Sequence, residues 1–437
     1  MVIRKNKLIV QLVITSVMTV IPQVQIRSAE MPQGATVQSG NVTITGTGSN
    51  HMTIDQKTSK SIINWNSFSI NSSGRVDFNM PSSSSSSLNR VTGSTPSNIA
   101  GQLNSNGKVL LINPNGVLIS PTGVINTKAF TASSLDINNK DFLNGKYKFE
   151  GNGNSKGVEN NGTVSVGGSG SANFFGAYVS NKGIVNAKLG KILLGAGEKI
   201  TLDLDGDGLM NIILSSEQLS SVKDLNGNTL QSLVYNNGKL AANGGIVQLS
   251  AGVAESLSMN AINTGASSEI YASTINKKTG KIVIGGKKNN FISLDGKIST
   301  SGLDDSNAGK IEVSGNNIYQ GASIYATGFR GGKIDILSED ILIMNGEIQA
   351  KGLKDNGGSL IVMSENSLYS SSDSKIDVSG YKKGGRIQSK AVNYNLASGS
   401  FKADSSSGNA GMIDITADFV NLDSVTISAQ GKEKGGK

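Results

Sequence analysis

Short runs of Val, Ile and Leu alternate with polar residues along most of the chain, and Gly, Asn, Asp or Ser separate them. This alternation is typical of half-buried β-strands, whereas the 3.6-residue period of amphipathic helices is almost absent. The 55 glycines and the aromatic content of 5% are also unlike a helical protein. The pattern therefore predicts an all-β protein built from many short strands.

The C-terminal third repeats one motif, in which a Gly-Gly or Ala-Gly pair is followed by a polar and then an aliphatic residue. The aliphatic residues are spaced by 23, 26, 27 and 26 residues, at Ile311, Ile334, Leu360, Ile387 and Ile413. Within one repeat, three short strands are expected at 334–336, 341–343 and 347–350, with Ile, Leu and Val pointing inward. A three-sided coil of this kind buries its apolar edge only by stacking on the next coil, about 4.8 Å away. The repeat therefore predicts a parallel β-helix.

Looser rungs of the same type are expected between about 105 and 275. The segments 160–164 and 181–185 both begin with Asn and lie 21 residues apart. The run Ser82–Ser87 predicts an exposed loop, and the poorly alternating segment 216–242 predicts an excursion from the rod. The final Gly435-Gly436-Lys437 would open another repeat, so we expect residues 276–437 to be β-helical repeats that are cut off in mid-repeat.

Residues 1–29 have the pattern of a secretory signal peptide. A basic start is followed by an apolar segment at 8–21, which is too short and too polar for a membrane span, and then by Pro22. Cleavage is expected near Ser28 or Ala29. Its removal takes away Arg4, Lys5, Lys7 and Arg27 and leaves 36 Lys plus Arg against 32 Asp plus Glu, a net charge of +4. So small and scattered a charge argues against a nucleic-acid partner.

The chemistry of the side chains argues against an enzyme. The chain has no cysteine and a single histidine, His51, which we expect in an exposed loop. A multi-histidine metal site and a thiol nucleophile are thereby excluded, and imidazole catalysis is disfavoured. Asp203, Asp205 and Asp207 alternate near two glycines, and a hydrogen-bonded turn is the favoured interpretation over a calcium site. We expect no catalytic residue, cofactor or resident metal.

One tetrapeptide, Asn113-Pro114-Asn115-Gly116, lies between the apolar runs 109–112 and 117–119. Proline followed by Asn-Gly suits a tight corner, because Pro fixes φ and Asn-Gly tolerates the left-handed conformation. The pattern predicts two buried strands joined at a sharp turn. That turn could be a structural corner, a contact for a partner, or both.

Several blocks in a fixed order, together with this tetrapeptide, carry a resemblance to a known family. They are Ser61–Phe68, Val76–Phe78, Leu88–Gly93, Ile99–Leu103, Gly107–Gly116, Leu202–Leu209 and Gly244–Leu249. This series resembles the N-terminal secretion domain of filamentous-haemagglutinin-like exoproteins of two-partner secretion systems, over residues 30–275. The resemblance implies a right-handed parallel β-helix, recognised in the periplasm by an outer-membrane β-barrel transporter.

On that resemblance, Asn113, Pro114, Asn115 and Gly116 match the secretion motif. A second such tetrapeptide, which some members carry, is absent here. Asn89, Arg90 and Trp65 are expected either to contact the partner or to be structural, with Trp65 favoured as a core anchor and Arg90 as a tie to backbone carbonyls.

The resulting hypothesis is a non-enzymatic exoprotein, an adhesin or haemagglutinin, that reaches the medium or the bacterial surface through the periplasm and outer membrane. Its expected partners are the transporter and a host-cell receptor or glycan, and we expect a monomer. One alternative is the N-terminal stalk of a contact-dependent growth-inhibition toxin. A polysaccharide lyase or hydrolase is disfavoured, because acidic residues do not cluster at rung spacing.

Overall fold

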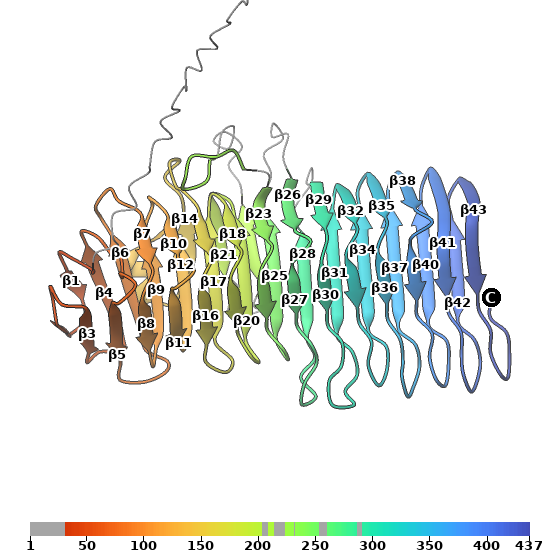
Figure 1. Ribbon diagram of the computed structural model, residues 1–437, viewed down its shortest axis with the longest axis horizontal. Coiled ribbons are helices and arrows are strands. Elements are labelled where there is room, and N and C mark those ends of the chain that lie inside the picture. Colours follow the sequence, from red (N-terminus) through yellow and green to blue (C-terminus); the bar gives the residue numbers. More distant parts are fainter. Residues whose placement is uncertain (1–30, 203–208, 214–222, 231, 253–259, 286–290) are drawn as a thin grey trace, which may run out of the picture.

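The computed structural model describes residues 31–202, 209–213, 223–230, 232–252, 260–285 and 291–437. They form one elongated parallel β-helix whose rungs stack along the long axis (Figure 1). The predicted all-β solenoid is thus confirmed. The predicted signal peptide at 1–29 lies outside the described residues, as do Asp203, Asp205 and Asp207.

One face of the rod is a 14-stranded sheet that is parallel except at its N-terminal end, where β1 pairs antiparallel with β4. Its strands, in order, are β1 (Thr36–Ser39), β4 (Lys60–Trp65), β6 (Ser86–Val91), β9 (Lys108–Ile112), β12 (Ala129–Ser133), β17 (Ser171–Gly176), β20 (Lys191–Ala196), β25 (Ile246–Ala251), β28 (Lys281–Gly285), β31 (Lys310–Gly315), β34 (Lys333–Ser338), β37 (Ser359–Ser364), β40 (Arg386–Ala391) and β42 (Met412–Thr416).

The other two faces are ladders of shorter strands. One ladder contains β2 (Val42–Thr45), β3 (His51–Gln56), β5 (Arg75–Asn79), β8 (Gln102–Ser105), β11 (Val124–Thr127), β16 (Thr163–Val166), β19 (Ile184–Asn186), β24 (Lys239–Ala241), β27 (Glu269–Tyr271), β30 (Lys297–Ser299), β33 (Ser323–Tyr325), β36 (Glu347–Gln349) and β39 (Lys375–Asp377). The other contains β7 (Ser97–Ile99), β10 (Val117–Ile119), β15 (Val158–Asn160), β18 (Val179–Asn181), β23 (Ser232–Asn236), β26 (Asn260–Thr264), β29 (Phe291–Leu294), β32 (Asn317–Gln320), β35 (Ile341–Met344) and β38 (Ser367–Ser370).

The two ladders merge at the C-terminal end, where β41 (Tyr394–Lys402) and β43 (Phe419–Ser428) each run along both. At the N-terminal end, β2 pairs antiparallel with β3. Together with β1, it covers the edge of the first parallel rung, which would otherwise expose unpaired backbone groups.

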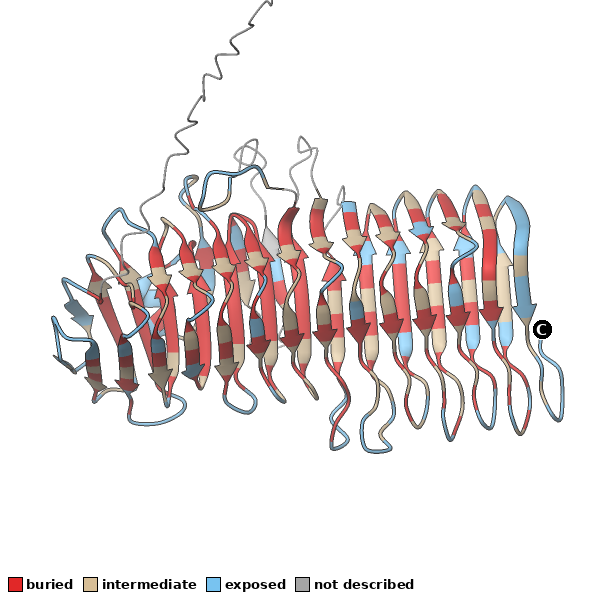
Figure 2. Cartoon of the chain, in the orientation of Figure 1, coloured by how far each residue is buried: buried red, intermediate tan, exposed pale blue. Residues whose placement is uncertain are grey.

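The register of the 14-stranded sheet follows the spacing of the sequence repeat. Ile311 pairs with Ile334, Ile334 with Leu360, Leu360 with Ile387 and Ile387 with Ile413. The first four of these side chains are fully buried, and Figure 2 shows the buried positions running through the interior along the rod. One repeat therefore contributes one rung to a continuous apolar core.

Three asparagines at equivalent positions of successive rungs form a stack inside the rod. The side chain of Asn160 donates to Asn181 at 2.7 Å, and that of Asn181 donates to Asn236 at 2.7 Å. The predicted rungs at 160–164 and 181–185 pair as expected. Because a buried amide is costly without partners, this stack of mutually bonded amides fixes the register.

A second, smaller core lies outside the 14-stranded sheet. The antiparallel strands β13 (Asp136–Ile137), β14 (Lys148–Glu150), β21 (Lys199–Leu202) and β22 (Met210–Ile213), with helix α1 (Asn139–Leu143), cover that face. Their apolar residues pack on outward-facing side chains of the sheet: Ile62, Leu88, Leu110, Ile112, Phe175 and Leu193. This second layer explains the unbroken apolar run 109–112, because β9 is buried on both faces.

Four local expectations were wrong in whole or in part. Within the run Ser82–Ser87, Ser82, Ser83 and Ser84 are exposed and outside the strands, as predicted. Ser85, Ser86 and Ser87 are buried, and the last two belong to β6, where Ser61 Oγ donates to Ser87 Oγ at 3.0 Å. Backbone pairing with the previous rung outweighs their loop-like composition.

The predicted excursion at 216–242 is shorter, since 232–236 and 239–241 are strands of the ladders. His51 begins strand β3 instead of lying in a loop, although its side chain is 59% exposed.

The apolar residues of a rung do not all point inward, contrary to the expectation for 341–343. In β35, every second residue faces outward, so Leu342 is buried while Ile343 is 42% exposed.

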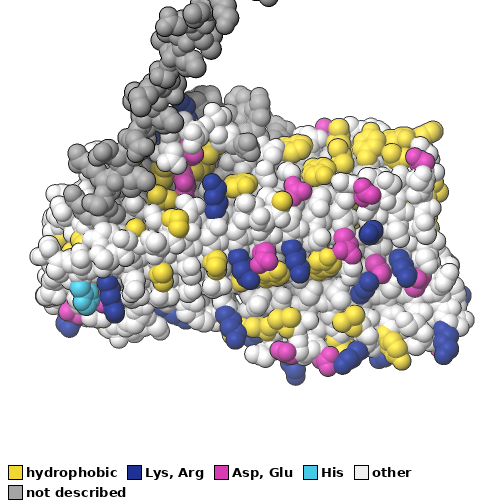
Figure 3. Space-filling view, in the orientation of Figure 1, with side chains coloured by type: hydrophobic (Ala, Val, Ile, Leu, Met, Phe, Trp, Pro, Cys, Tyr) yellow, Lys and Arg dark blue, Asp and Glu magenta, His cyan; other side chains and the backbone are white. Residues whose placement is uncertain are grey.

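Charged side chains on the rod's surface are of mixed sign. On the face in Figure 3, Lys and Arg are interspersed with Asp and Glu over the C-terminal rungs. Lys333 and Asp335, for example, form an ion pair of 2.8 Å. Among the described residues, no helix is long and apolar enough to span a membrane.

Candidate functional site

The tetrapeptide Asn113–Gly116 forms the corner between β9 and β10. The amide of Gly116 donates to the carbonyl of Asn113 at 2.9 Å and closes a β-turn with Pro114 at its first central position. Gly116 has φ of +106°, a conformation that favours glycine. The predicted sharp corner between two buried strands is confirmed.

The side chain of Asn113 holds this corner from inside and is fully buried. Its Nδ2 donates to the carbonyl of Thr95 at 2.9 Å and to Ser97 Oγ at 3.0 Å. Its Oδ1 accepts from the backbone and side-chain nitrogens of Asn115, both at 3.0 Å. Both donor hydrogens and both acceptor positions of the amide are therefore used, so the folded corner presents no free polar atom of Asn113.

The next rung and a downstream turn cover the same corner. Lys156 N donates to the carbonyl of Pro114 at 3.0 Å, and Val117 N donates to the carbonyl of Gly157 at 3.2 Å. Leu225 lies over Gly116, where a Cβ would be 2.5 Å from Leu225 Cδ2.

The turn that carries Leu225 is attached to the rod through Glu159. Its Oε1 accepts from Leu225 N at 3.1 Å and from the hydroxyl of Tyr178 at 2.5 Å. Burial and the adjacent Glu159 carboxylate raise the pKa of Tyr178, so its hydroxyl keeps the proton that it donates. Residues 223–230 thus form a clasp over the tetrapeptide, about 110 residues downstream of it in the chain.

Trp65 and Asn89 meet inside the rod near its N-terminal end. Trp65 is 1% exposed and Asn89 is fully buried. The indole Nε1 donates to Asn89 Oδ1 at 3.0 Å, and the indole ring lies edge-on to Phe68 with centroids 5.3 Å apart. These contacts make both residues core elements of the first rungs, as favoured for Trp65.

Arg90 points outward from β6 and is bonded to the second layer. Its Nε donates to Asp136 Oδ1 at 2.8 Å, and its Nη1 donates to Asn139 Oδ1 at 2.8 Å. Its Nη2 donates to the carbonyl of Ile137 at 2.6 Å. Three bonds from one planar guanidinium fix the start of the outer sheet to the rod. Arg90 therefore bonds to one backbone carbonyl, as expected, but the segment that it holds is strand β13 and the start of helix α1 and not a loop.

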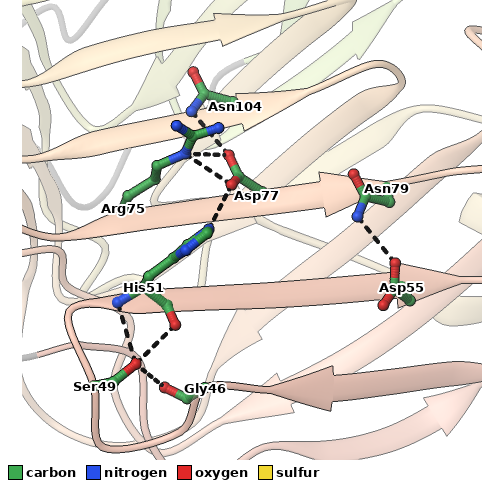
Figure 4. Close-up of polar contacts among 8 residues, drawn as sticks. All are labelled: Gly46, Ser49, His51, Asp55, Arg75, Asp77, Asn79 and Asn104. Carbon is green, nitrogen blue, oxygen red and sulfur yellow. Dashed lines mark hydrogen bonds and ion pairs between the residues drawn. The ribbon is translucent and has the colours of Figure 1, made fainter.

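A polar cluster at the N-terminal rungs was not singled out from the sequence (Figure 4). Asp77 accepts from Arg75 Nε at 2.9 and 2.8 Å and from Asn104 Nδ2 at 2.9 Å, and lies 2.7 Å from His51 Nε2. Burial alone would raise the pKa of Asp77, but these hydrogen bonds and the charge of Arg75 together hold it below its usual value.

Ser49 contacts His51 only through backbone atoms, since its hydroxyl donates to the carbonyls of Gly46 and His51. This arrangement stabilises the turn and does not place a serine against the imidazole ring. Sequence spacing could not have shown the cluster, because its members come from three successive rungs.

The architecture is that of a β-helical secretion domain, with a covered first rung, an outer antiparallel sheet and an Asn-Pro-Asn-Gly corner in which Asn113 and Gly116 are buried. The family model for the TPS secretion domain matches residues 29–300, and the chain belongs to this family. Its members are exoproteins exported across the outer membrane through a transporter. The boundary predicted at 275 lies inside this match and stays a prediction.

Relatives and a solved structure agree with this placement. A heme/hemopexin-binding protein of Haemophilus influenzae is 34% identical over 227 residues, which cover 49% of this chain and 23% of that protein. Another protein of that name from the same species is 28% identical over 300 residues, covering 63% of this chain and 30% of its own length. The crystal structure of the HMW1 secretion domain from Haemophilus influenzae matches with a TM-score of 0.62 and 26% identity, covering 93% of this chain and all of that domain. The chain thus spans less than a third of the length of these two relatives.

Proposed function

We propose that this chain directs the export of a secreted exoprotein through a dedicated β-barrel transporter in the outer membrane. The match of residues 29–300 to the TPS secretion domain carries this proposal. A β-helix suits the route because each rung contacts mainly its two neighbours, so rungs can fold in order as they emerge. Burial of each new apolar edge then supplies free energy for passage in one direction.

The geometry of the corner suggests when the transporter would read the tetrapeptide. Asn113 is fully buried with its amide completely bonded, and the main chain of Pro114 is paired with Lys156 in the next rung. The Asn113 amide is already bonded to Thr95 and Ser97 of the preceding rung, whereas the carbonyl of Pro114 stays open until the next rung is added. A partner that recognises this carbonyl would need it before that rung is added. Once Lys156 has bonded to Pro114 and Leu225 has packed over Gly116, the transporter could no longer contact these groups, which would favour release of the exoprotein from the transporter.

We further propose that the exported rod acts at the bacterial surface as a non-enzymatic adhesin. Its support is the alternation of buried and outward-facing, at least partly exposed side chains on paired strands of one ladder, such as β32 and β35, which repeats one surface along the rod. A repeated surface suits multivalent contact with a host receptor or glycan.

A second candidate function is binding of heme or hemopexin, which the names of the two relatives favour. Titration of the purified chain with hemin, followed by absorbance, and capture of hemopexin on the immobilised chain test this candidate. Saturable binding of either would favour it over adhesion, and binding of neither would reject it.

Expression with and without a two-partner secretion transporter from the same genome tests the export proposal. The expected result is release into the medium only with the transporter and retention in the periplasm without it. Equal release in both strains would overturn the proposal. A periplasmic protein without a secretion domain serves as the leakage control.

A further inference from the structure

A long groove lies along the corner that precedes the 14-stranded sheet in the C-terminal rungs. It has a volume of about 880 Å³ and extends from Thr279 to Lys437. Its floor is the column of glycines at the repeat motif. A Cβ on Gly358 would lie 2.2 Å from the carbonyl oxygen of Gly332, and one on Gly385 would lie 2.2 Å from that of Gly358. No side chain fits there, so the floor is bare backbone over successive rungs.

The first wall of the groove is formed by the residues that begin the strands of the sheet. Lys310 pairs with Lys333, Lys333 with Ser359, and Ser359 with Arg386. The first two are partly neutralised, because Asp335 lies 3.7 Å from Lys310 and 2.8 Å from Lys333. Arg386 is exposed and forms no ion pair among the described residues.

The second wall is formed by a column of residues from the loops on the other side. Asn356, Lys383, Asn409 and Lys434 occupy equivalent places, because their carbonyls accept from Gly331, Gly357, Gly384 and Ala410 of the neighbouring rung. Lys383 and Lys434 are exposed and, within the described chain, have no carboxylate partner. This wall therefore alternates amides with free cations at the rung spacing of about 4.8 Å.

The charged side chains that line the groove are all positive, whereas the surface in Figure 3 carries charges of both signs. Among the described residues that line it are Lys310, Lys333, Lys383, Arg386, Lys434 and Lys437, and no Asp or Glu side chain is among them. Cations along a linear groove favour a linear polyanion, and the interleaved Asn and Ser side chains can bond to hydroxyl groups.

We propose that this groove binds an acidic polysaccharide, a glycan chain carrying carboxylate or sulfate groups, with its axis along the rod. The absence of aromatic side chains among the described lining residues favours a glycan over single-stranded nucleic acid, whose bases need stacking platforms. The site stands on its own observations and does not depend on the export route.

Binding of the purified full chain to immobilised heparin and to polygalacturonate tests this site, with dextran as the neutral control and oligothymidylate as the nucleic-acid competitor. The variant Lys383→Gln/Arg386→Gln/Lys434→Gln should bind at least one of the two acidic glycans about tenfold more weakly. The matched control Lys57→Gln/Lys375→Gln/Lys390→Gln removes three exposed cations elsewhere and should bind normally. All six positions are exposed, so the circular dichroism spectrum should stay that of the parent.

A gain of function gives a second, independent readout. Asn409 lies between Lys383 and Lys434 on the second wall, in register with both. Asn409→Lys should therefore tighten binding severalfold, whereas Asn393→Lys, an exposed position outside the groove, should change it less. Equal weakening in both triple variants, no binding of either acidic glycan, or equally strong binding of oligothymidylate would each overturn the proposal.

Discussion

Leu225 lies over Gly116, so that a Cβ at position 116 would be only 2.5 Å from Leu225 Cδ2. A residue in the middle of the chain thus seals the corner that carries the Asn-Pro-Asn-Gly motif. Glu159 holds the covering turn through its bond to Leu225 N. The corner reaches its final state only after the turn at 223–230 is in place.

Gly116→Ala should destabilise the domain by about 1–3 kcal/mol, because it combines an unfavourable positive φ with crowding. The end of the Leu225 side chain must shift, and the carbonyl oxygen of Gly157 lies only 3.2 Å from the new Cβ. Gly48→Ala is the matched control, since Gly48 has φ of +80° but no atom within 4 Å of its Cβ position. The control should lose only about 1 kcal/mol. Denaturant unfolding of both variants measures the difference, and adding Leu225→Ala should restore part of the loss. Equal losses at the two glycines would contradict the clasp.

Gly358→Ala should cost more than about 2 kcal/mol, although Gly358 has no positive φ, because its Cβ would meet the carbonyl of Gly332. Gly168→Ala provides the comparison, because no heavy atom lies within 4 Å of that Cβ position. Thermal unfolding should show a lowered midpoint for the first variant alone. A normal midpoint for Gly358→Ala would mean that the rungs are stacked less closely than described.

Arg90→Gln should loosen the outer layer without unfolding the rod, because Arg90 bonds to Asp136, Ile137 and Asn139. A charged hydrogen-bond network of this kind is worth about 1.5–3 kcal/mol. Hydrogen exchange should speed up over residues 136–150 and stay unchanged in β9 and β12. Lys148→Gln, an exposed change in the same layer, should leave exchange as it is. If hydrogen exchange over residues 136–150 is the same in Arg90→Gln as in the parent and in Lys148→Gln, the anchoring role of Arg90 is refuted.

Acid should weaken the N-terminal rungs through Asp77, whose pKa is held below its usual value. The unfolded chain then takes up a proton at higher pH than the folded chain, so stability is present above the ordinary pKa of about 3.9 and is lost as the pH falls through the lowered value. Unfolding free energies between about pH 6 and pH 2 should show this decline, and Asp77→Asn should flatten it. An unchanged slope in the variant would assign the acid sensitivity to other carboxylates.

The rung register could be predicted from the sequence because glycine and aliphatic residues recur at nearly constant spacing, and Ile311, Ile334 and Leu360 pair as that spacing requires. The corner at 113–116 could also be predicted, because proline restricts φ to the value that a turn needs and glycine readily adopts a positive φ.

The outer sheet could not be predicted in the same way. Ile62 and Leu110 signal a second buried face, but the strands that cover them lie far away in the chain. Likewise, nothing local in the sequence connects Leu225 to Gly116 or brings His51 to Asp77. Ser86 and Ser87 misled the prediction because the hydrogen bonds of the ladder, and not side-chain polarity, decide that they form a strand.

Secretion of two variants of equal stability decides whether the corner is read as an export signal or serves only as a fold element. Asn113→Ala removes the amide that holds the corner and leaves Ser97 and Asn115 without that partner. Its core control is Leu111→Ala or Val109→Ala, whichever matches its free energy of unfolding, since both residues are buried in the preceding strand. With the transporter present, we predict that Asn113→Ala accumulates in the periplasm while the matched core variant is released. Equal release of the two variants would contradict recognition of Asn113–Gly116.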